Sequence, residues 1–264
     1  MNWSSFSFVD RHIVFRALVN ETLAINLLLD TGAGQSATFE TVGRKLRLAT
    51  QDSREEVRTI AGSHAQVPVV AISCLKTGAV VHDQVVCLLL PDHMQADPSF
   101  DAVVGSNVLS AMKILIDFPQ RNLAFLKEDE GAPLSGMSLV RFDIRENVPI
   151  VSVDVGGKPT DALLDTGSGE TVVFREPVAR HDKRKTTSIT LGPGLSFDVE
   201  AEVQPLAELS RGLRIGAILG NDMWTDCLLL IDYSGARLGV KRERKRGTGT
   251  LPTSSQRDVR PYSE

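Results

Sequence analysis

The amino-acid sequence predicts an all-β protein built from two similar halves. Of its 264 residues 42% are hydrophobic, and these stand in short runs separated by turn-forming residues, a pattern typical of strands. Long amphipathic helical patterns are scarce. Several separate segments also recur in the same order in both halves of the chain, which indicates an internal duplication. Each half is long enough to bury a core of its own.

The first repeated segment predicts a β-hairpin. In the first half, apolar residues 15–19 and 27–29 flank the pair Asn20-Glu21, and in the second half, apolar residues 150–155 and 163–164 flank Gly156-Gly157. A short polar or glycine pair between apolar runs favours a hairpin turn. In both copies the second strand ends in Asp-Thr-Gly, at residues 30–32 and 165–167. Two carboxyl groups therefore occupy equivalent positions in the repeat.

The repeat continues downstream of these acids. Residues 102–109 match residues 217–224, with Gly105 and Gly220 at equivalent positions. Twelve residues after each glycine stands an aspartate, Asp117 or Asp232, followed by an apolar segment. Fixed spacing over several segments favours duplication over coincidence. A single Asp-Thr-Gly in an ordinary turn needs no functional role, but two copies in matched context make that alternative a minor one.

In both halves two apolar residues precede Asp-Thr-Gly. Further along each half, two apolar residues are followed by a glycine and a short helix. This pattern resembles the aspartic proteases of the retropepsin and pepsin type. The resemblance extends over about residues 8–243. It implies a bilobal aspartic protease fold, in which two retropepsin-like, β-barrel-like lobes surround a pseudo-twofold axis with the active site between them.

The resemblance and the local composition together predict the domain boundaries. We expect an N-terminal lobe at residues 1–130 and a C-terminal lobe at 139–243. The segment between them, 131–138, is rich in Gly, Pro and Ser and suits a linker. Residues 244–264 are basic and polar with few apolar residues, and we expect them to be disordered.

The resemblance also implies which residues form the active site. Asp30 and Asp165 are the expected catalytic pair, and Thr31 and Thr166 are expected to brace the two loops through hydroxyl and backbone bonds. Gly32 and Gly167 are expected to allow a tight turn and a close approach of the two loop backbones. Ser168 is expected to support the loop that contains it. The residues expected to bind substrate are Gly34, Gly169, Ala61, Gly62 and Ser63.

The chemistry of paired carboxyl groups agrees with this expectation. Two carboxylates held close together cannot both ionise easily, so the pair shares one proton and titrates in two coupled steps. The ionised member can take a proton from a water molecule while the protonated member polarises a peptide carbonyl. We therefore expect peptide hydrolysis with no metal, no other cofactor and no covalent intermediate.

The two halves differ in length between their landmarks. Asp30 and Asp165 are 135 residues apart, whereas Gly105 and Gly220 are 115 apart, so the first half holds 20 additional residues. Alignment places them within about residues 40–70, as a short helix at 40–48 and a hairpin at about 56–67. The resemblance implies that this hairpin is a single substrate-covering flap, with Gly62 and Ser63 at its tip; an ordinary surface hairpin is the alternative.

A second difference concerns the acidity of the pair. Ala33 follows the first Asp-Thr-Gly, whereas Ser168 follows the second. A serine hydroxyl can donate a hydrogen bond that stabilises a carboxylate, and alanine cannot. The sequence thus predicts that Asp165 ionises more readily than Asp30, and that the activity optimum is less acidic than in pepsins.

Charge and composition narrow the remaining possibilities. A net charge of −4 gives no reason to expect nucleic acid or membrane partners, and one chain that supplies both acids can act as a monomer on a peptide or protein substrate. The three cysteines lack a metal-binding spacing and are expected to be free thiols, although a Cys74–Cys87 bridge is an alternative. No signal peptide or transmembrane segment is evident, so the expected location is cytoplasmic, or periplasmic or anchored if the true start lies upstream.

We expect an aspartic-type endopeptidase. The alternative on the same fold is a catalytically silent, or highly partner-restricted, peptide-binding module.

Overall fold

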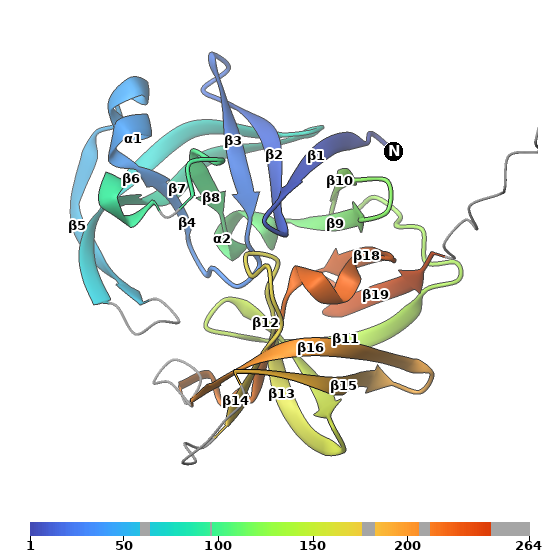
Figure 1. Cartoon of the computed structure of the whole chain (residues 1–264). Coiled ribbons are helices and arrows are strands. Elements are labelled where there is room, and N and C mark those ends of the chain that lie inside the picture. Colours follow the sequence, from blue (N-terminus) through green and yellow to red (C-terminus); the bar gives the residue numbers. More distant parts are fainter. Residues whose placement is uncertain (59–63, 96, 176–182, 206–211, 244–264) are drawn as a thin grey trace, which may run out of the picture.

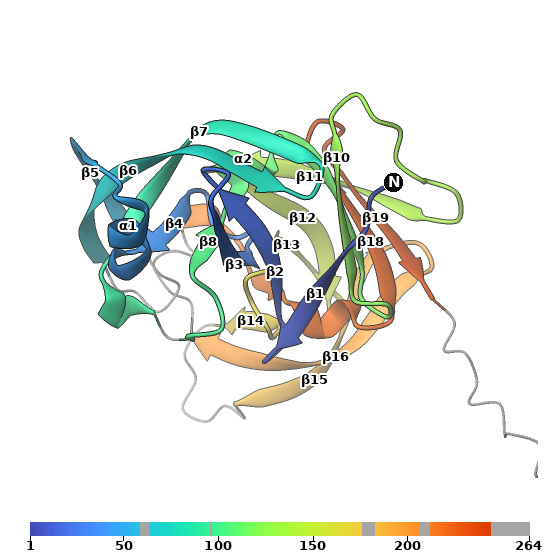
Figure 2. The same ribbon diagram turned by 90° about the horizontal axis from the view of Figure 1, so that it is seen from above.

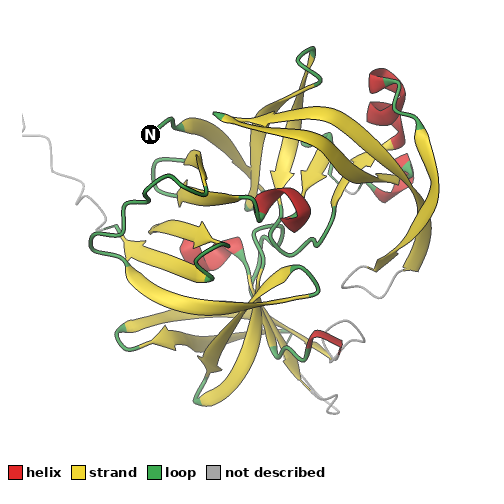
Figure 3. Ribbon diagram, turned by 180° about the vertical axis from the view of Figure 1, so that it is seen from behind, coloured by secondary structure: helices red, strands yellow, loops and turns green. Residues whose placement is uncertain are grey.

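Alternating apolar residues produce a chain made mainly of β-strands (Figure 3). The computed structural model describes residues 1–58, 64–95, 97–175, 183–205 and 212–243. The first-half strands are β1 (Ser4–Val9), β2 (His12–Val19), β3 (Leu23–Leu29), β4 (Ser36–Phe39), β5 (Thr50–Arg58), β6 (His64–Thr77), β7 (Val80–Leu90), β8 (Ala102–Val104), β9 (Met112–Asp117) and β10 (Asn122–Lys127). The second-half strands are β11 (Ser138–Arg145), β12 (Val148–Val155), β13 (Lys158–Leu164), β14 (Val172–Arg175), β15 (Arg184–Gly192), β16 (Leu195–Pro205), β17 (Ala217–Leu219), β18 (Cys227–Asp232) and β19 (Arg237–Arg242).

Helical segments are short and follow particular strands. They are α1 (Glu40–Leu46), η1 (Asp92–Met94), α2 (Ser106–Leu109) and η2 (Asn221–Trp224). Within the described residues the strands connect into one large mixed sheet. The expected predominance of β-structure is therefore confirmed.

Strand pairing follows the same plan in both halves. The hairpin of β2 and β3 corresponds to that of β12 and β13. In each hairpin the second strand also pairs in parallel with a short downstream strand, and Leu28 lies opposite Val103 just as Leu163 lies opposite Ile218. That downstream strand pairs antiparallel with β4 in the first half and with β14 in the second. The segments that repeat in the sequence thus form repeated strand pairings.

A run of six strands joins the two halves (Figures 1 and 2). Its order is β1, β10, β9, β18, β19, β11, and every neighbouring pair is antiparallel. At its centre β9 lies beside β18, with Leu115 opposite Leu230. Both of these leucines are fully buried, and each such side chain contributes about 1.5–3 kcal/mol when removed from water. The junction between the halves is therefore part of the apolar core.

The additional residues of the first half form α1, β5 and the start of β6. The helix ends at Leu46, close to the expected end, and Arg47 follows it in the left-handed backbone conformation common after a helix. The expected hairpin is longer than predicted, because β5 already pairs with β6 at Thr50 and Val70. Its tip, which includes Ala61, Gly62 and Ser63, lies outside the described residues.

The remaining expectations about organisation have mixed outcomes. Between β10 and β11 the chain forms no strand, which suits a linker, but the domain boundaries stay a prediction. The tail at 244–264 lies outside the described residues.

All three cysteines are free, with Cys87 and Cys227 buried, so the alternative Cys74–Cys87 bridge is absent. Among the described residues no helix is long and apolar enough to cross a bilayer.

Candidate active site

The two Asp-Thr-Gly loops begin where β3 and β13 end. Asp30 N–H donates to the Val104 carbonyl at 3.1 Å, and Asp165 N–H donates to the Leu219 carbonyl at the same distance. Because each acid is tied to the end of a short parallel strand pair, its backbone position is set by the sheet. The two strand ends bring the loops together although they are far apart in the sequence.

Each acid packs directly against the glycine of the opposite loop. A Cβ atom built on Gly32 would lie 2.4 Å from Cγ of Asp165, and one built on Gly167 would lie 2.3 Å from Cγ of Asp30. No side chain fits at such distances. Glycine is required at both positions by the close approach of the opposite carboxyl group, which also shows that the structure brings Asp30 and Asp165 together.

The two threonines form a reciprocal set of hydrogen bonds. The Thr31 hydroxyl donates to the Leu164 carbonyl at 2.7 Å and accepts from Thr166 N–H at 3.0 Å. The Thr166 hydroxyl donates to the Leu29 carbonyl at 2.9 Å and accepts from Thr31 N–H at 3.0 Å. Both side chains are fully buried. Each hydroxyl satisfies one carbonyl and one amide of the opposite loop, so the loops are fixed relative to each other.

The two carboxyl groups receive different numbers of backbone bonds. Asp165 accepts from the N–H groups of Gly167 and Ser168, at 2.8 and 3.1 Å, whereas Asp30 accepts from Ala33 N–H at 2.9 Å. Burial raises the pKa of both acids, and for Asp30 the charge of Asp165 raises the pKa further, to well above its usual range. Backbone donors offset part of the rise in pKa for both acids. Because the charge of Asp165 raises the pKa of Asp30 and Asp165 has the additional backbone donor, Asp165 is the member that ionises more readily.

The expected role of the Ser168 hydroxyl is wrong. Its Oγ donates to the Glu170 carbonyl at 2.7 Å, whereas Asp165 is stabilised by the backbone N–H of Ser168. A serine side chain commonly bonds to a nearby backbone group in its own turn, and that local bond holds the hydroxyl here. The predicted order of ionisation agrees with the directions of the two pKa shifts, and the group of Ser168 that contributes to it is the backbone N–H.

Each loop has a further polar support at an equivalent position. In the first half the Ser36 hydroxyl donates to Asn107 Oδ1 at 2.7 Å and accepts from Gly105 N–H at 3.0 Å. In the second half the Thr171 hydroxyl donates to Asp222 Oδ1 at 2.6 Å and accepts from Gly220 N–H at 3.3 Å. These bonds tie the end of each loop to the glycine turn downstream.

A cavity of about 570 Å³ opens over the two acids. We call it the aspartate cavity, and its lining residues are Asp30, Gly32, Ala33, Gly34, Gln35, Glu56, Val57, Leu88, Glu146, Val148, Leu163, Asp165 and Leu213. Glu56 and Val57 belong to β5, so the described part of the predicted flap borders the same cavity as the acids. Of the expected substrate-binding glycines, Gly34 lines the cavity. Gly169 lies instead against the turn after β1, where its added Cβ would be 2.7 Å from the Asp10 carbonyl.

Several cavity residues were not predicted from the sequence. Glu146 lies in the turn between β11 and β12, and Val148 is the first residue of β12. The Glu146 carbonyl would lie 3.1 Å from a Cβ on Gly34. The signal was present in the repeat, because this turn corresponds to the turn at Asp10 and Arg11, which borders Gly169. Each half therefore extends one turn across the loop of the other.

No group of three or more His, Cys, Asp or Glu side chains in the described part of the chain is arranged to hold a metal ion.

Comparison with known families adds one finding. The sequence model of a family described as "Aspartyl protease" matches residues 15–108. The matched segment contains Asp30 and extends from β2 to α2, so the first half of the chain contains an aspartyl protease domain. A search of curated proteins returned no match to this chain.

Proposed function

We propose that this protein is an aspartic endopeptidase, in which Asp30 and Asp165 activate a water molecule for peptide hydrolysis. The observation that carries the proposal is the reciprocal packing of the two loops. Each acid lies against the glycine of the other loop, and each threonine hydroxyl bonds to the backbone of the other loop. An ordinary strand-end turn needs neither feature.

The difference between the acids assigns their roles. Asp165 has two backbone donors and is the ionised member, whereas Asp30 keeps the proton that the pair shares. Asp165 takes a proton from water as the water oxygen bonds to the peptide carbon, and Asp30 gives its proton to the carbonyl oxygen. Asp165 then passes its proton to the amide nitrogen and the C–N bond breaks. One hydroxyl proton of the tetrahedral intermediate returns to Asp30 as the new carboxyl group forms, which restores the starting state.

The second half is proposed to be a lobe equivalent to the first. Its support is the matched strand pairing, since the register of β13 with β17 repeats that of β3 with β8. The six-strand run would join the two lobes, and a pseudo-twofold axis would pass between Gly32 and Gly167. A single chain would then form a complete site as a monomer.

Substrate is proposed to bind as an extended strand in the aspartate cavity. The β5–β6 hairpin borders this cavity through Glu56 and Val57, so its strands are positioned to cover a bound peptide. Extended peptides are commonly held by backbone bonds, with side-chain pockets setting preference. Val57, Leu88 and Leu213 supply apolar surface for such a pocket.

A peptide library tests the proposal directly. The parent protein should cleave members of the library, and Asp30→Asn and Asp165→Asn should each lower kcat/KM by about 100-fold or more. Asp129→Asn, at an exposed loop position, is the matched control and should cleave like the parent. Stoichiometric peptide binding with no cleavage by the parent, unchanged in either aspartate variant, would instead indicate a peptide-binding module.

A further inference from the structure

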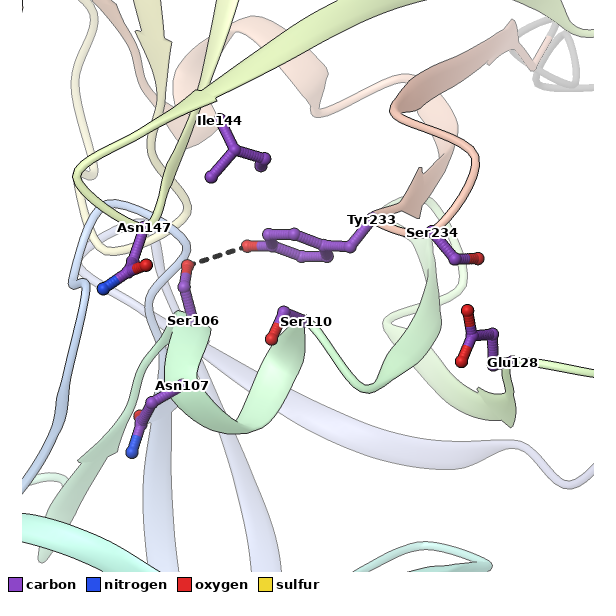
Figure 4. A pocket seen from close by; sticks show the side chains of 8 residues that line it. All are labelled: Ser106, Asn107, Ser110, Glu128, Ile144, Asn147, Tyr233 and Ser234. Carbon is purple, nitrogen blue, oxygen red and sulfur yellow. Dashed lines mark hydrogen bonds between the residues drawn. The ribbon is translucent and has the colours of Figure 1, made fainter.

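A second pocket, of about 310 Å³, is lined by residues of α2, of the β11–β12 hairpin and of the turn after β18 (Figure 4). We call it the Tyr233 pocket; its lining residues are Ser106, Asn107, Ser110, Glu128, Ile144, Asn147, Tyr233 and Ser234. Figure 4 shows the Tyr233 hydroxyl directed at Ser106. The two oxygens are 3.0 Å apart, and both residues are buried.

The direction of this bond follows from the next one. Ser106 Oγ donates its only proton to the Thr31 carbonyl, at 3.2 Å. Since a hydroxyl group carries one proton, Ser106 must accept from Tyr233, which is therefore the donor. Burial raises the pKa of Tyr233, the hydrogen bond with Ser106 lowers it, and the charges of the two aspartates raise it. The net shift is upward, so the phenol keeps its proton. Tyr233, Ser106 and Thr31 thus form one directed chain of hydrogen bonds.

This series of hydrogen bonds ends on the peptide group that joins Thr31 to Gly32. The Thr31 carbonyl belongs to the same peptide unit as Gly32 N–H. The Gly32 backbone lies against the Asp165 carboxyl group, and its N–H lowers the pKa of both acids. A hydrogen bond accepted by an amide carbonyl polarises the amide and strengthens its N–H as a donor.

The second half holds the equivalent peptide by a different side chain. Asn221 Nδ2 donates to the Thr166 carbonyl at 2.7 Å, and Gly167 N–H of that peptide donates to Asp165 at 2.8 Å. The residue equivalent to Tyr233 is Phe118, which has no hydroxyl. Their rings pack alike: Phe118 lies edge-on to Phe6 at 6.2 Å and Tyr233 edge-on to Phe142 at 5.9 Å. The first half therefore uses Tyr and Ser where the second uses Asn.

We propose that Tyr233 is a positioning residue for the aspartate pair: through Ser106 it holds and polarises the Thr31–Gly32 peptide, and Gly32 lies against the Asp165 carboxyl group. The inference rests on the proposed function for its kinetic readout. It assigns a role to a side chain that contacts neither acid nor substrate.

The expected consequence is a shift in pH dependence. Without the Tyr233 hydroxyl the Gly32 N–H becomes a weaker donor, so the ionised form of the pair is less stabilised and both of its pKa values rise. The other charged groups that border the acids are Glu56 and Glu146 in the aspartate cavity, and Glu128 lines the Tyr233 pocket. All three remain in place in the variants below, so the shift can be assigned to the hydroxyl.

Three variants test the role of the hydrogen bonds that run from Tyr233 through Ser106 to Thr31. Tyr233→Phe should move the whole kcat/KM profile upward by roughly 0.3–0.7 pH unit, because polarisation changes a hydrogen bond by only a fraction of its strength. On the acid limb this is a loss of about 2- to 5-fold at fixed pH. Ser110→Ala, which removes another hydroxyl from the same pocket, should leave the profile in place. Ser106→Asn combined with Tyr233→Phe installs the Asn and Phe of the second half and should restore the parental profile.

The outcomes separate this inference from the proposed function. A Tyr233→Phe profile lowered equally at every pH, or one that the double variant does not restore, would show that Tyr233 only supports folding. If the parent cleaves no peptide, the proposed function fails, but the inference can still be tested by the pH dependence of thermal unfolding. The fall in stability as the acids ionise begins at the carboxyl pKa of the unfolded chain and should then extend to higher pH in Tyr233→Phe. A fall that ends at the same pH as in the parent overturns the inference.

Discussion

The two halves of the molecule share a strand plan but differ in how they treat their acids. Asp165 is bound by two backbone N–H groups and is 5% exposed, whereas Asp30 is bound by one and is half-buried. The first half also carries α1 and β5, and it supports its loop with Tyr and Ser where the second uses Asn. Similar strand plans thus surround the two acids with different hydrogen-bond donors, which suits the proposed sharing of one proton.

Gly32 and Gly167 occupy equivalent positions in the two loops, so substituting each of them tests whether the two halves are equivalent there. In Gly32→Ala or Gly167→Ala the new Cβ would lie less than 3 Å from the opposite carboxyl group, so the loops must separate. Each variant should lose activity by more than about 100-fold and about 1–3 kcal/mol of unfolding free energy, as overpacked cores do. Urea unfolding and peptide turnover measure these losses.

Gly131→Ala is the matched control, because an added Cβ there meets no atom within 4 Å. It should resemble the parent in both assays. Normal turnover in either loop variant would mean that the two acids do not need the observed approach.

The threonine brace should also be symmetric. Thr31→Val or Thr166→Val leaves one buried carbonyl and one buried amide of the opposite loop without a partner. Unsatisfied buried groups cost about 1–3 kcal/mol each, so each variant should lower the unfolding free energy by several kcal/mol and to a similar extent. Chemical denaturation of the two variants compares them directly.

A third threonine provides the control for this pair. The Thr38 hydroxyl is buried and has no hydrogen-bond partner among the described residues, so Thr38→Val should cost little or even stabilise. If Thr31→Val and Thr166→Val differ widely, the two loops are not braced equally.

The unequal acids predict a pH effect on stability. Because folding raises the pKa of both acids, the folded state binds more protons than the unfolded state between the ordinary carboxyl range and the raised values. Stability is therefore lost as pH rises through this window. Asp30→Asn should remove most of the loss, and Asp165→Asn a smaller part, so both variants should melt above the parent at neutral pH.

Thermal unfolding from pH 3 to pH 8 gives the measurement. The variants and the parent should converge at the acid end, where the carboxyl groups are protonated in both states. A parent whose stability rises between pH 4 and pH 7, with flat variants, would mean that the acids are stabilised as anions and do not share a proton.

Local patterns in the sequence predicted the acids, the repeat and the additional hairpin, because each depends on neighbouring residues. The helix at α1 and the pairing of β5 with β6 follow from such patterns. Glu146 and Leu213 could not be assigned to the cavity in this way, since their contacts depend on how one half extends across the other. The role predicted for the Ser168 hydroxyl was wrong because of a local contact. This hydroxyl donates to the Glu170 carbonyl, two residues along the chain.

The turns that extend across the loops carry different charges. Glu146 and Asn147 border Gly34, whereas the equivalent Asp10 and Arg11 border Gly169. The first of these turns has a net negative charge, and the second also carries Arg11, which pairs with Glu170 at 3.0 Å. A carboxylate at the edge of the aspartate cavity should favour substrates with a basic side chain near that end. Glu146→Gln should reduce kcat/KM for lysine-containing peptides by about 2- to 5-fold, the scale of exposed charge pairs, and leave neutral peptides unchanged.

Salt provides a second check on this preference. Because Glu146 is exposed, raising the ionic strength should weaken the preference of the parent for basic peptides. Equal turnover of basic and neutral peptides by the parent would show that this carboxylate does not contribute to selection.

The smallest expected effect addresses the source of the asymmetry itself. Ser168 Oγ donates to the Glu170 carbonyl, so Ser168→Ala should leave the pH profile of kcat/KM unmoved, and Ala33→Ser should not make Asp30 the more acidic member. If Ser168→Ala instead moves the acid limb upward, the hydroxyl does reach Asp165 in solution. An unmoved limb places the asymmetry in the turn backbone, where Gly167 and Ser168 each give one N–H to Asp165. A side-chain exchange between the halves would then leave the order of ionisation intact, because that order depends on the conformation of the two turns.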